Sequence, residues 1–499
     1  MGHSAPTVEH LDAIYSLNVE VQSQRYDRLA KKFTDVYGTK PDFIARAPGR
    51  VNIIGEHIDY CGFPVFPMAI APDVLLAVHS NGTDRVRIAN INAEKYPARD
   101  FSIADIFEID SKVHEWSNYF KCGYRSLLEH MGRKDGKGFD ALLDGTVPAG
   151  GGLSSSAAFI CATQLAVQRV NGIDLPQTVL ASVASSAERY VGVNSGGMDQ
   201  TASIMGQQGS ALFIEFDPAL KATPVKLPES NPPLAFIIAN TLVVSDKHVT
   251  APVCYNLRVV ETRIGALILA RQLGIADRAA CKNVDPLTFK AVMDEYFSAQ
   301  DTAGKDEVQV WIDRLSAMLD AANEAFGAHP DGFTREDMAA ALGVAPAELS
   351  AKVHEDLFPV RAERFRLLQR AQHAFSETLR VVRFRQICES GDSSTDYFTA
   401  LGDLMNQSQD SCRDLFECSC PEIDELCAIA RKAGSFGSRL TGAGWGGCTV
   451  HLVPQDRVES VKQALKAEYY TKKYPNLAAA QLDNALFATA PGCGACYYA

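Results

Sequence analysis

Long hydrophobic runs are absent from this sequence of 499 residues. None of its apolar stretches approaches the roughly 18 residues that a helix needs to cross a membrane. The first residues, among them Glu9, His10 and Asp12, contain no basic segment followed by an apolar core, so they do not resemble a secretory signal. These absences argue against a membrane protein and predict a chain that works in the cytoplasm.

A surplus of basic residues is absent as well. The 48 Lys and Arg residues are outnumbered by 60 Asp and Glu residues, which gives a formal net charge of −12. Because a nucleic-acid ligand requires cations that neutralise its phosphates, no nucleic-acid partner is expected. Any anionic substrate must therefore be held by a few local groups.

The sequence also lacks the signs of a disulfide framework. Its thirteen cysteines are an odd number in a large chain, which predicts reduced thiols. Two close pairs occur, CSC at 418–420 and CGAC at 493–496, but neither has a second Cys/His pair at zinc-finger spacing. No zinc site is predicted. The composition, 46% hydrophobic and 22% charged, is ordinary globular usage and predicts two or three domains.

The most informative segment is a glycine-rich loop that runs into an apolar stretch. Residues 148–158 read PAGGGLSSSAA, and apolar residues continue to Val167. Glycines let the main chain approach a phosphate closely, and the free amide groups at the start of the following helix attract anions. The loop has no Walker A lysine, which leaves the serine hydroxyls to reach a phosphate or a metal ion. The alternative is a flexible turn before a core helix.

A second segment crowds charged side chains into a few positions. Residues 49–60 read GRVNIIGEHIDY and follow a short apolar stretch, 43–45, that is typical of a strand. Two carboxylates flanking a histidine offer acceptors and a donor suited to sugar hydroxyls. Taken alone, such a cluster could equally be a surface turn.

Together these motifs resemble the galactokinase branch of the GHMP small-molecule kinases. Residues 49–60 resemble the galactose-binding signature of that branch, and 148–158 resemble the ATP loop of the superfamily. A third block, SRLTGAGWGG at 438–447, is similar to its glycine-rich C-terminal motif. A likeness to fungal galactokinases comes from three further segments, 116–123, 239–245 and 255–261. The resemblance as a whole extends from about residue 41 to 491.

The resemblance implies a function and two alternatives. It implies ATP-dependent phosphorylation of the anomeric hydroxyl of α-D-galactose to galactose 1-phosphate, with ATP and Mg²⁺ as cofactors. One alternative is an N-acetylgalactosamine kinase. The other is a galactose- and ATP-sensing protein that binds a transcriptional repressor, as a silent paralogue of the fungal enzymes does. That paralogue lacks the Ser-Ala dipeptide present here as Ser156 and Ala157, which favours an enzyme.

The resemblance also assigns roles to residues. Asp199, in the segment GVNSGGMDQ at 192–200, matches the catalytic aspartate, and Arg50 matches the arginine that stabilises negative charge in the transition state. The alternatives are a turn aspartate and an arginine that only braces its loop. The implied sugar contacts are Arg50, Glu56, His57, Asp59, Asp199 and Tyr255.

The nucleotide and metal sites are implied in the same way. Ser156 and Glu188 are the expected magnesium ligands, since Mg²⁺ needs only one or two protein oxygens besides phosphates and water. The alternative for Glu188 is a helix-surface glutamate. Trp116 is either a core residue or a neighbour of adenine. The expected contacts to the nucleotide are Gly150, Gly152, Ser154, Ser155 and Ser156.

The expected fold is α+β with two lobes. By resemblance, a mixed-sheet N-terminal lobe (1–230) and an antiparallel-sheet and helical C-terminal lobe (231–499) enclose the active site between them. Apolar patterning adds a helix that ends at Asn171 with Gly172 as its cap, a helix N-cap at Thr334, and helical elaboration over 277–355. Strands are predicted at 74–78, 235–239, 449–453 and 486–489, and a helical apolar stripe at Phe365, Leu368, Phe375, Leu379 and Val382.

Overall fold

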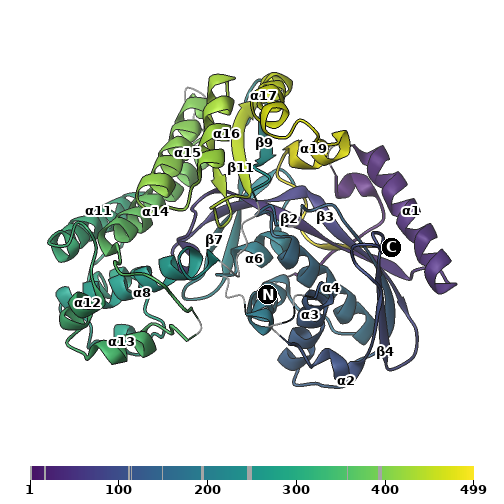
Figure 1. Ribbon diagram of the computed structural model, residues 1–499, viewed down its shortest axis with the longest axis horizontal. Helices are drawn as coiled ribbons and strands as arrows, with labels where there is room; N and C mark the ends of the chain where they lie inside the picture. Colours follow the sequence, from purple (N-terminus) through teal and green to yellow (C-terminus); the bar gives the residue numbers. More distant parts are fainter. Residues whose placement is uncertain are drawn as a thin grey trace.

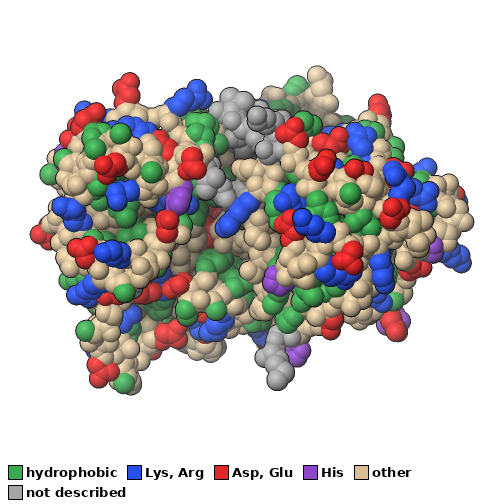
Figure 2. Space-filling model, turned by 90° about the horizontal axis from the view of Figure 1, so that it is seen from below, with side chains coloured by type: hydrophobic (Ala, Val, Ile, Leu, Met, Phe, Trp, Pro, Cys, Tyr) green, Lys and Arg blue, Asp and Glu red, His purple; other side chains and the backbone are tan. Residues whose placement is uncertain are grey.

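The chain folds around two main β-sheets that lie side by side, with helices packed against both (Figure 1). The computed structural model describes residues 3–15, 18–110, 113, 115–148, 150–192, 196–243, 250–356, 358–391 and 396–499. Among these, no helix is both long and apolar enough to cross a membrane. On the face shown in Figure 2, acidic and basic side chains are interspersed.

The first sheet has seven strands in the order β1-β13-β2-β3-β6-β4-β5. It is mixed, because the β4–β6 and β1–β13 pairs are parallel and the other pairs are antiparallel. The last of its strands in sequence, β13, therefore lies between two strands from the beginning of the chain. The strands are β1 (Thr7–Val8), β2 (Phe43–Ile54), β3 (Phe66–Ser80), β4 (Arg85–Asn90), β5 (Arg99–Ser102), β6 (Phe139–Gly145) and β13 (Cys496–Tyr498).

Alternating side chains of this sheet face two different cores. Ile44 and Leu75 belong to the cluster under α1 (Val19–Tyr37), whereas their neighbours Ala45 and Leu76 belong to the larger cluster on the opposite face. On that second face, α4 (Ser155–Asn171) and α6 (Met198–Met205) pack on β2 and β3, and α3 (Ser117–His130) and α5 (Gln177–Ala187) pack on α4. Short elements complete this part: η1 (Leu11–Ala13), η2 (Asp59–Cys61), α2 (Ile103–Ile106), η3 (Glu188–Val191), β7 (Ser210–Glu215) and β8 (Lys221–Lys226).

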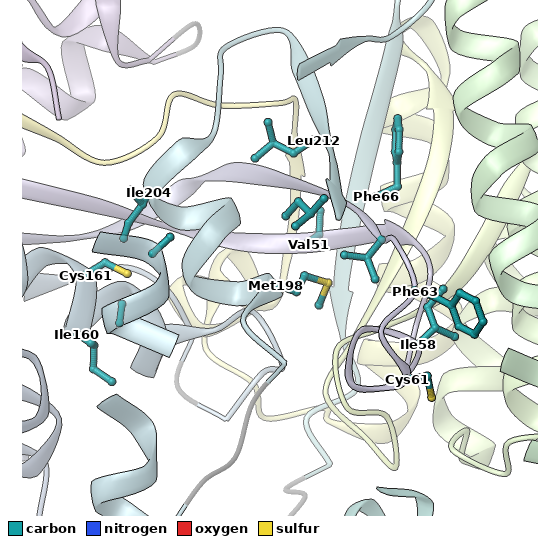
Figure 3. Close-up of a cluster of buried hydrophobic side chains, with 14 of the residues drawn as sticks. Val51, Ile58, Cys61, Phe63, Phe66, Ile160, Cys161, Met198, Ile204 and Leu212 are labelled. Atoms are coloured by element: carbon teal, nitrogen blue, oxygen red, sulfur yellow. The ribbon is translucent and has the colours of Figure 1, made fainter. Parts of the chain in front are cut away.

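The buried side chains between these elements hold α6 against β2. Figure 3 shows Met198 of α6, Val51 of β2 and Leu212 of β7 within one apolar cluster, with Cys161 of α4 nearby. All four are buried. This packing fixes the start of α6 relative to the middle of β2.

The second sheet has four antiparallel strands in the order β10-β11-β9-β12. Helices α15, α16 and α17 pack on it, and α14 also contacts β2 of the first sheet. The strands are β9 (Leu234–Asn240), β10 (Gly437–Thr441), β11 (Cys448–Pro454) and β12 (Leu486–Thr489). The helices are α8 (Tyr255–Gln272), α9 (Ala279–Lys282), α10 (Phe289–Tyr296), α11 (Glu307–Phe326), α12 (Arg335–Leu342), α13 (Pro346–Lys352), α14 (Leu367–Glu389), α15 (Tyr397–Asp414), α16 (Pro421–Lys432), η4 (Gln455–Arg457), α17 (Val458–Leu465), η5 (Lys466–Tyr470), α18 (Thr471–Lys473) and α19 (Ala479–Ala485).

The structure confirms the α+β class and the predicted strands, which fall within β2, β3, β9, β11 and β12. The ends of two helices are confirmed as well: Gly172 caps α4 at φ 64°, and Thr334 caps α12 in a capping box. One residue of the apolar stripe is misplaced. Phe365 precedes α14 and pairs with Phe333 in an isolated β-bridge. The division near residue 230 stays a prediction.

A buried charged cluster ties α1 to the first sheet. Asp73 of β3 accepts hydrogen bonds from Arg46 Nε at 2.7 Å, Arg25 Nη1 at 2.6 Å and the Tyr15 hydroxyl at 2.5 Å. The Asp73 side chain is 0% exposed. Arg25 also pairs with Asp144 at 3.0 Å, whereas the ion pair of the fully buried Arg46 is with Asp73. Loss of the Asp73 carboxylate therefore leaves the charge of Arg46 buried without compensation.

We therefore expect Asp73→Ala to lower the free energy of unfolding by about 3–5 kcal/mol. The matched control is Asp100→Ala, which removes an ion pair with Arg85 whose side chains are 49% and 51% exposed. This control should cost less than about 1 kcal/mol. Urea unfolding of both variants measures the difference, and equal losses would contradict a structural role for the cluster.

Candidate active site

A pocket of about 1100 Å³ brings the three sequence motifs together. Its walls come from β2 and the start of α4 and α6 on one side, and from the start of α8 and the loop after β10 on the other. Every predicted site residue lines it: Arg50, Glu56, His57, Asp59, Gly150, Gly152, Ser154, Ser155, Ser156, Glu188, Asp199 and Tyr255.

Arg50 and Asp199 form an ion pair in this pocket. Arg50, in β2, places Nε and Nη2 at 2.7 and 2.6 Å from Asp199 Oδ1, and its Nη1 donates to the Gly152 carbonyl at 2.6 Å. Asp199 lies in the first turn of α6, and its side chain is 24% exposed. One guanidinium thus joins the carboxylate to the glycine-rich loop and compensates its negative charge.

The glycine-rich loop leaves the first turn of α4 open to a ligand. Ser154 is the N-cap, at φ 61°, but its hydroxyl donates to Asp199 Oδ2 at 2.5 Å and makes no capping bond. Gly152 has φ 72°, and a Cβ on it would lie 3.2 Å from the Thr441 carbonyl. The result is a helix N-terminus that faces the pocket with uncapped amide groups, which is a favourable anion site.

Glu188 lies beside the serine cluster. It opens η3 directly after α5, and its Oε1 accepts a hydrogen bond from Ser156 Oγ at 2.8 Å. Gln200 Nε2 donates to Oε2 at 3.1 Å. Since Glu188 is only 4% exposed, the alternative of a solvated helix-surface glutamate is wrong.

Asp59 is held close to the start of α6. A Cβ on Gly196 would approach Asp59 Oδ2 to 2.1 Å, so the contact requires glycine there. Burial, and after it the nearby Asp199 carboxylate, raise the pKa of Asp59 to about 7. Residues 193–195 of this segment lie outside the described residues.

Glu56 and His57 line the pocket but are tied to neighbouring groups. Glu56 Oε2 lies 2.8 Å from Arg439 Nη1, and Oε1 accepts from the Gly442 amide at 2.7 Å. The ring nitrogens of His57 lie 2.9 Å from the Tyr60 hydroxyl and 3.0 Å from the Ala443 carbonyl. Burial lowers the pKa of His57 to about 3, so the ring is neutral at pH 7.

Aromatic rings form the wall next to His57. The ring centroids of Tyr255 lie 5.8 Å from His57 and 5.7 Å from Tyr60, and Trp445 lies 5.7 Å from His57. Trp116, at the N-cap of α3, is half-buried, stacks on Phe159 and also lines the pocket. Trp116 is thus neither a fully buried core residue nor remote from the site.

Two supporting residues were missed at the sequence level. Arg439 is 0% exposed and joins Glu56 to the carbonyls of Asn52 and Ile53. Glu377 of α14 accepts from the backbone amides of Gly55 and Glu56 at 2.9 and 3.3 Å. Although burial opposes ionisation, Arg380 and Arg439 hold the pKa of Glu377 at about 2.

The third motif packs against the glycine-rich loop. A Cβ on Gly442 would lie 2.6 Å from the Gly152 carbonyl, and Gly442 itself has φ 86°. Thr441 exchanges hydrogen bonds with the backbone of Asn52 at 2.9 and 3.1 Å. The glycines of this motif therefore allow the loop after β10 to meet the glycine-rich loop backbone against backbone.

Family models match three parts of the chain. They are described as the galactokinase galactose-binding signature at residues 31–80, the GHMP kinases N terminal domain at 118–207, and the GHMP kinases C terminal at 396–471. Galactokinase from Saccharomyces cerevisiae is 43% identical and covers 95% of both chains. Galactokinase from Candida parapsilosis is 39% identical and covers 97% of this chain and 96% of its own.

Solved structures share the fold. Lactococcus lactis galactokinase complexed with galactose superposes with a TM-score of 0.66 at 24% identity, over 94% of this chain and 99% of its own. Methanococcus jannaschii mevalonate kinase superposes with a TM-score of 0.52 at 16% identity, over 90% of this chain and 98% of its own. The fold is that of the GHMP kinases, and the full-length similarity shows that the chain belongs to the galactokinase family.

Proposed function

We propose that this enzyme transfers the γ-phosphoryl group of ATP to the anomeric hydroxyl of α-D-galactose and releases galactose 1-phosphate. The observation that carries the proposal is the contact between Arg50 and Asp199 beside the uncapped start of α4. Phosphoryl transfer needs a proton acceptor for the attacking hydroxyl and a cation near the transferring group, and this pair supplies both.

Each pocket residue then has a chemical task. Asp199 accepts the proton of the sugar hydroxyl, and Arg50 stabilises negative charge on the transferring phosphoryl group. Asp59 accepts hydrogen bonds from other sugar hydroxyls, and Tyr255 bounds the sugar with its ring. Glu56 and His57 contact the sugar in this proposal, and their positions in the pocket lining support that role.

The chain also has groups that fit ATP and Mg²⁺. The start of α4 with Gly150, Gly152 and the serines fits the phosphates, because glycine φ values near 72° turn the backbone around the anion. Ser156 and Glu188 would hold Mg²⁺ with two oxygens, which is the hard donor set that this ion prefers. When bound, ATP would supply the phosphoryl group and Mg²⁺ would neutralise part of its charge. The half-buried Trp116 is the proposed neighbour of adenine.

The preference for galactose over N-acetylgalactosamine, a repressor-binding role and a cytoplasmic location remain predictions. A coupled kinase assay with galactose, N-acetylgalactosamine, glucose and mevalonate tests the sugar preference and distinguishes an enzyme from a sensor. We expect turnover with galactose and little with the other three. Absence of turnover with every sugar, together with retained galactose binding, would support the sensor instead.

Asp199→Asn tests the proton acceptor. The amide keeps the shape of the side chain but not its basicity, so kcat should fall by at least about 100-fold while galactose binding persists. Asp100→Asn, an exposed change outside the pocket lining, is the control and should leave kcat unchanged. Steady-state kinetics with galactose and calorimetric binding give both quantities, and near-normal turnover of Asp199→Asn would refute the assignment.

Asp59 should make galactose binding depend on pH. Its pKa of about 7 leaves it protonated below neutrality and ionised above, and the ionised form is the stronger acceptor for sugar hydroxyls. If only the ionised form binds well, the apparent dissociation constant of galactose should fall about tenfold between pH 6 and 8. Calorimetry at several pH values measures it. In Asp59→Asn this dependence should disappear, and an unchanged pH profile in that variant would assign the effect to another group.

A further inference from the structure

The C-terminal loop brings two thiols together outside the active site. Cys496 is the first residue of β13, is 0% exposed and is in register with Arg46 of β2. Cys493, three residues earlier, is half-buried, and the two thiols are joined by a hydrogen bond. A partly exposed cysteine thus lies beside a buried one within the sequence CGAC.

The loop is fixed tightly in place. The Gly494 amide donates to the Gly206 carbonyl at 2.7 Å, and the Ala495 amide donates to the Ser203 carbonyl at 2.9 Å. A Cβ on Gly494 would lie 2.6 Å from the Ile204 carbonyl, so this approach requires glycine. The backbone between the two cysteines is therefore held in position by hydrogen bonds to the end of α6.

A cation stands beside the pair. Arg46 Nη1 donates to the carbonyls of Cys493 and Gly494 at 2.6 and 3.0 Å, while its buried Nη2 has no hydrogen-bond partner in the described part of the chain. The hydrogen bond from Cys496, with the Arg46 charge in addition, lowers the pKa of Cys493 to about 6 despite burial. The pKa of the Cys496 thiol is raised well above its ordinary value, first by its hydrogen bond to Cys493 and then by burial.

This pair is better suited to redox chemistry than to metal binding. Across the described ranges, no group of three or more His, Cys, Asp or Glu side chains is placed to hold a metal ion. Cys412 and Cys418 also lie close to each other, but both are 0% exposed and cannot meet a reagent in solution. Cys493 and Cys496 instead combine partial exposure of one residue, contact between the thiols and a neighbouring cation.

We propose that Cys493 and Cys496 form a reversible redox site, in which Cys493 attacks a low-molecular-weight disulfide and Cys496 resolves the product to an intramolecular disulfide. This arrangement of an accessible, activated thiol and a buried resolving thiol is typical of reactive CxxC pairs.

The reaction balances with a small disulfide as the oxidant. The Cys493 thiolate forms a bond to one sulfur of oxidised glutathione, the S–S bond of glutathione breaks, and one glutathione thiolate leaves. Cys496 then loses its proton to solvent and attacks Cys493 Sγ, which expels the second glutathione thiolate. The protein loses two electrons and two protons, and oxidised glutathione gains them as two reduced molecules.

The test uses the full-length protein in glutathione buffers of increasing oxidised fraction, followed by alkylation of the remaining thiols and peptide mass spectrometry. We expect a 493–496 disulfide that disappears when reduced glutathione is restored. In Cys496→Ser the reaction should stop with glutathione on Cys493, and in Cys493→Ser neither product should form.

Cys254 provides the matched control, because it is also half-buried but burial raises its pKa. At pH 7 iodoacetamide should alkylate Cys493 at least about threefold faster than Cys254. Equal alkylation rates, or a wild-type protein that carries only mixed glutathione adducts under oxidising conditions, would overturn the proposal. Cys254→Ser should leave the 493–496 disulfide unchanged, and its loss in that variant would also count against the pair.

Discussion

The geometry of the active site depends on a buried ion pair. Arg439 of β10 and Glu56 of the loop after β2 are 0% and 2% exposed at the side chain and lie 2.8 Å apart. Each would be costly to bury alone, because removal of one partner of such a pair leaves an uncompensated charge in a medium of low dielectric. The second sheet and residues 49–60 are therefore stabilised in one relative position.

That constraint extends to the glycine-rich loop through backbone contacts. Glu56 also accepts a hydrogen bond from Gly442, and Gly442 in turn packs against the Gly152 carbonyl. Arg50 links this loop to α6, because it donates hydrogen bonds to both the Gly152 carbonyl and the Asp199 carboxylate. Residues 49–60, the glycine-rich loop and the Arg50–Asp199 pair are thus linked by a short series of contacts, so a displacement of one segment would strain the others.

The parts of this arrangement that depend on local sequence patterns could be predicted from the sequence. The helix after the glycine-rich loop, its cap at Gly172 and the strand at 43–45 follow from apolar spacing and glycine chemistry. The proximity of Arg50 and Asp199 came from family resemblance, since 149 residues separate them. Glu377 could not be found this way: it lies in the middle of α14, and its contact with the Gly55 amide is set by tertiary packing rather than by any local pattern.

The position of β13 has a consequence for the order in which the protein can be assembled during synthesis. β1 pairs with β13 and not with β2, so residues 496–498 separate two strands that leave the ribosome hundreds of residues earlier. Until those last residues emerge, the edge of β2 is uncovered and β1 has no strand to join. The seven-stranded sheet therefore becomes complete only after translation has passed through the second sheet, and a nascent chain would expose an unpaired strand edge, which is a known starting point for aggregation, throughout that interval.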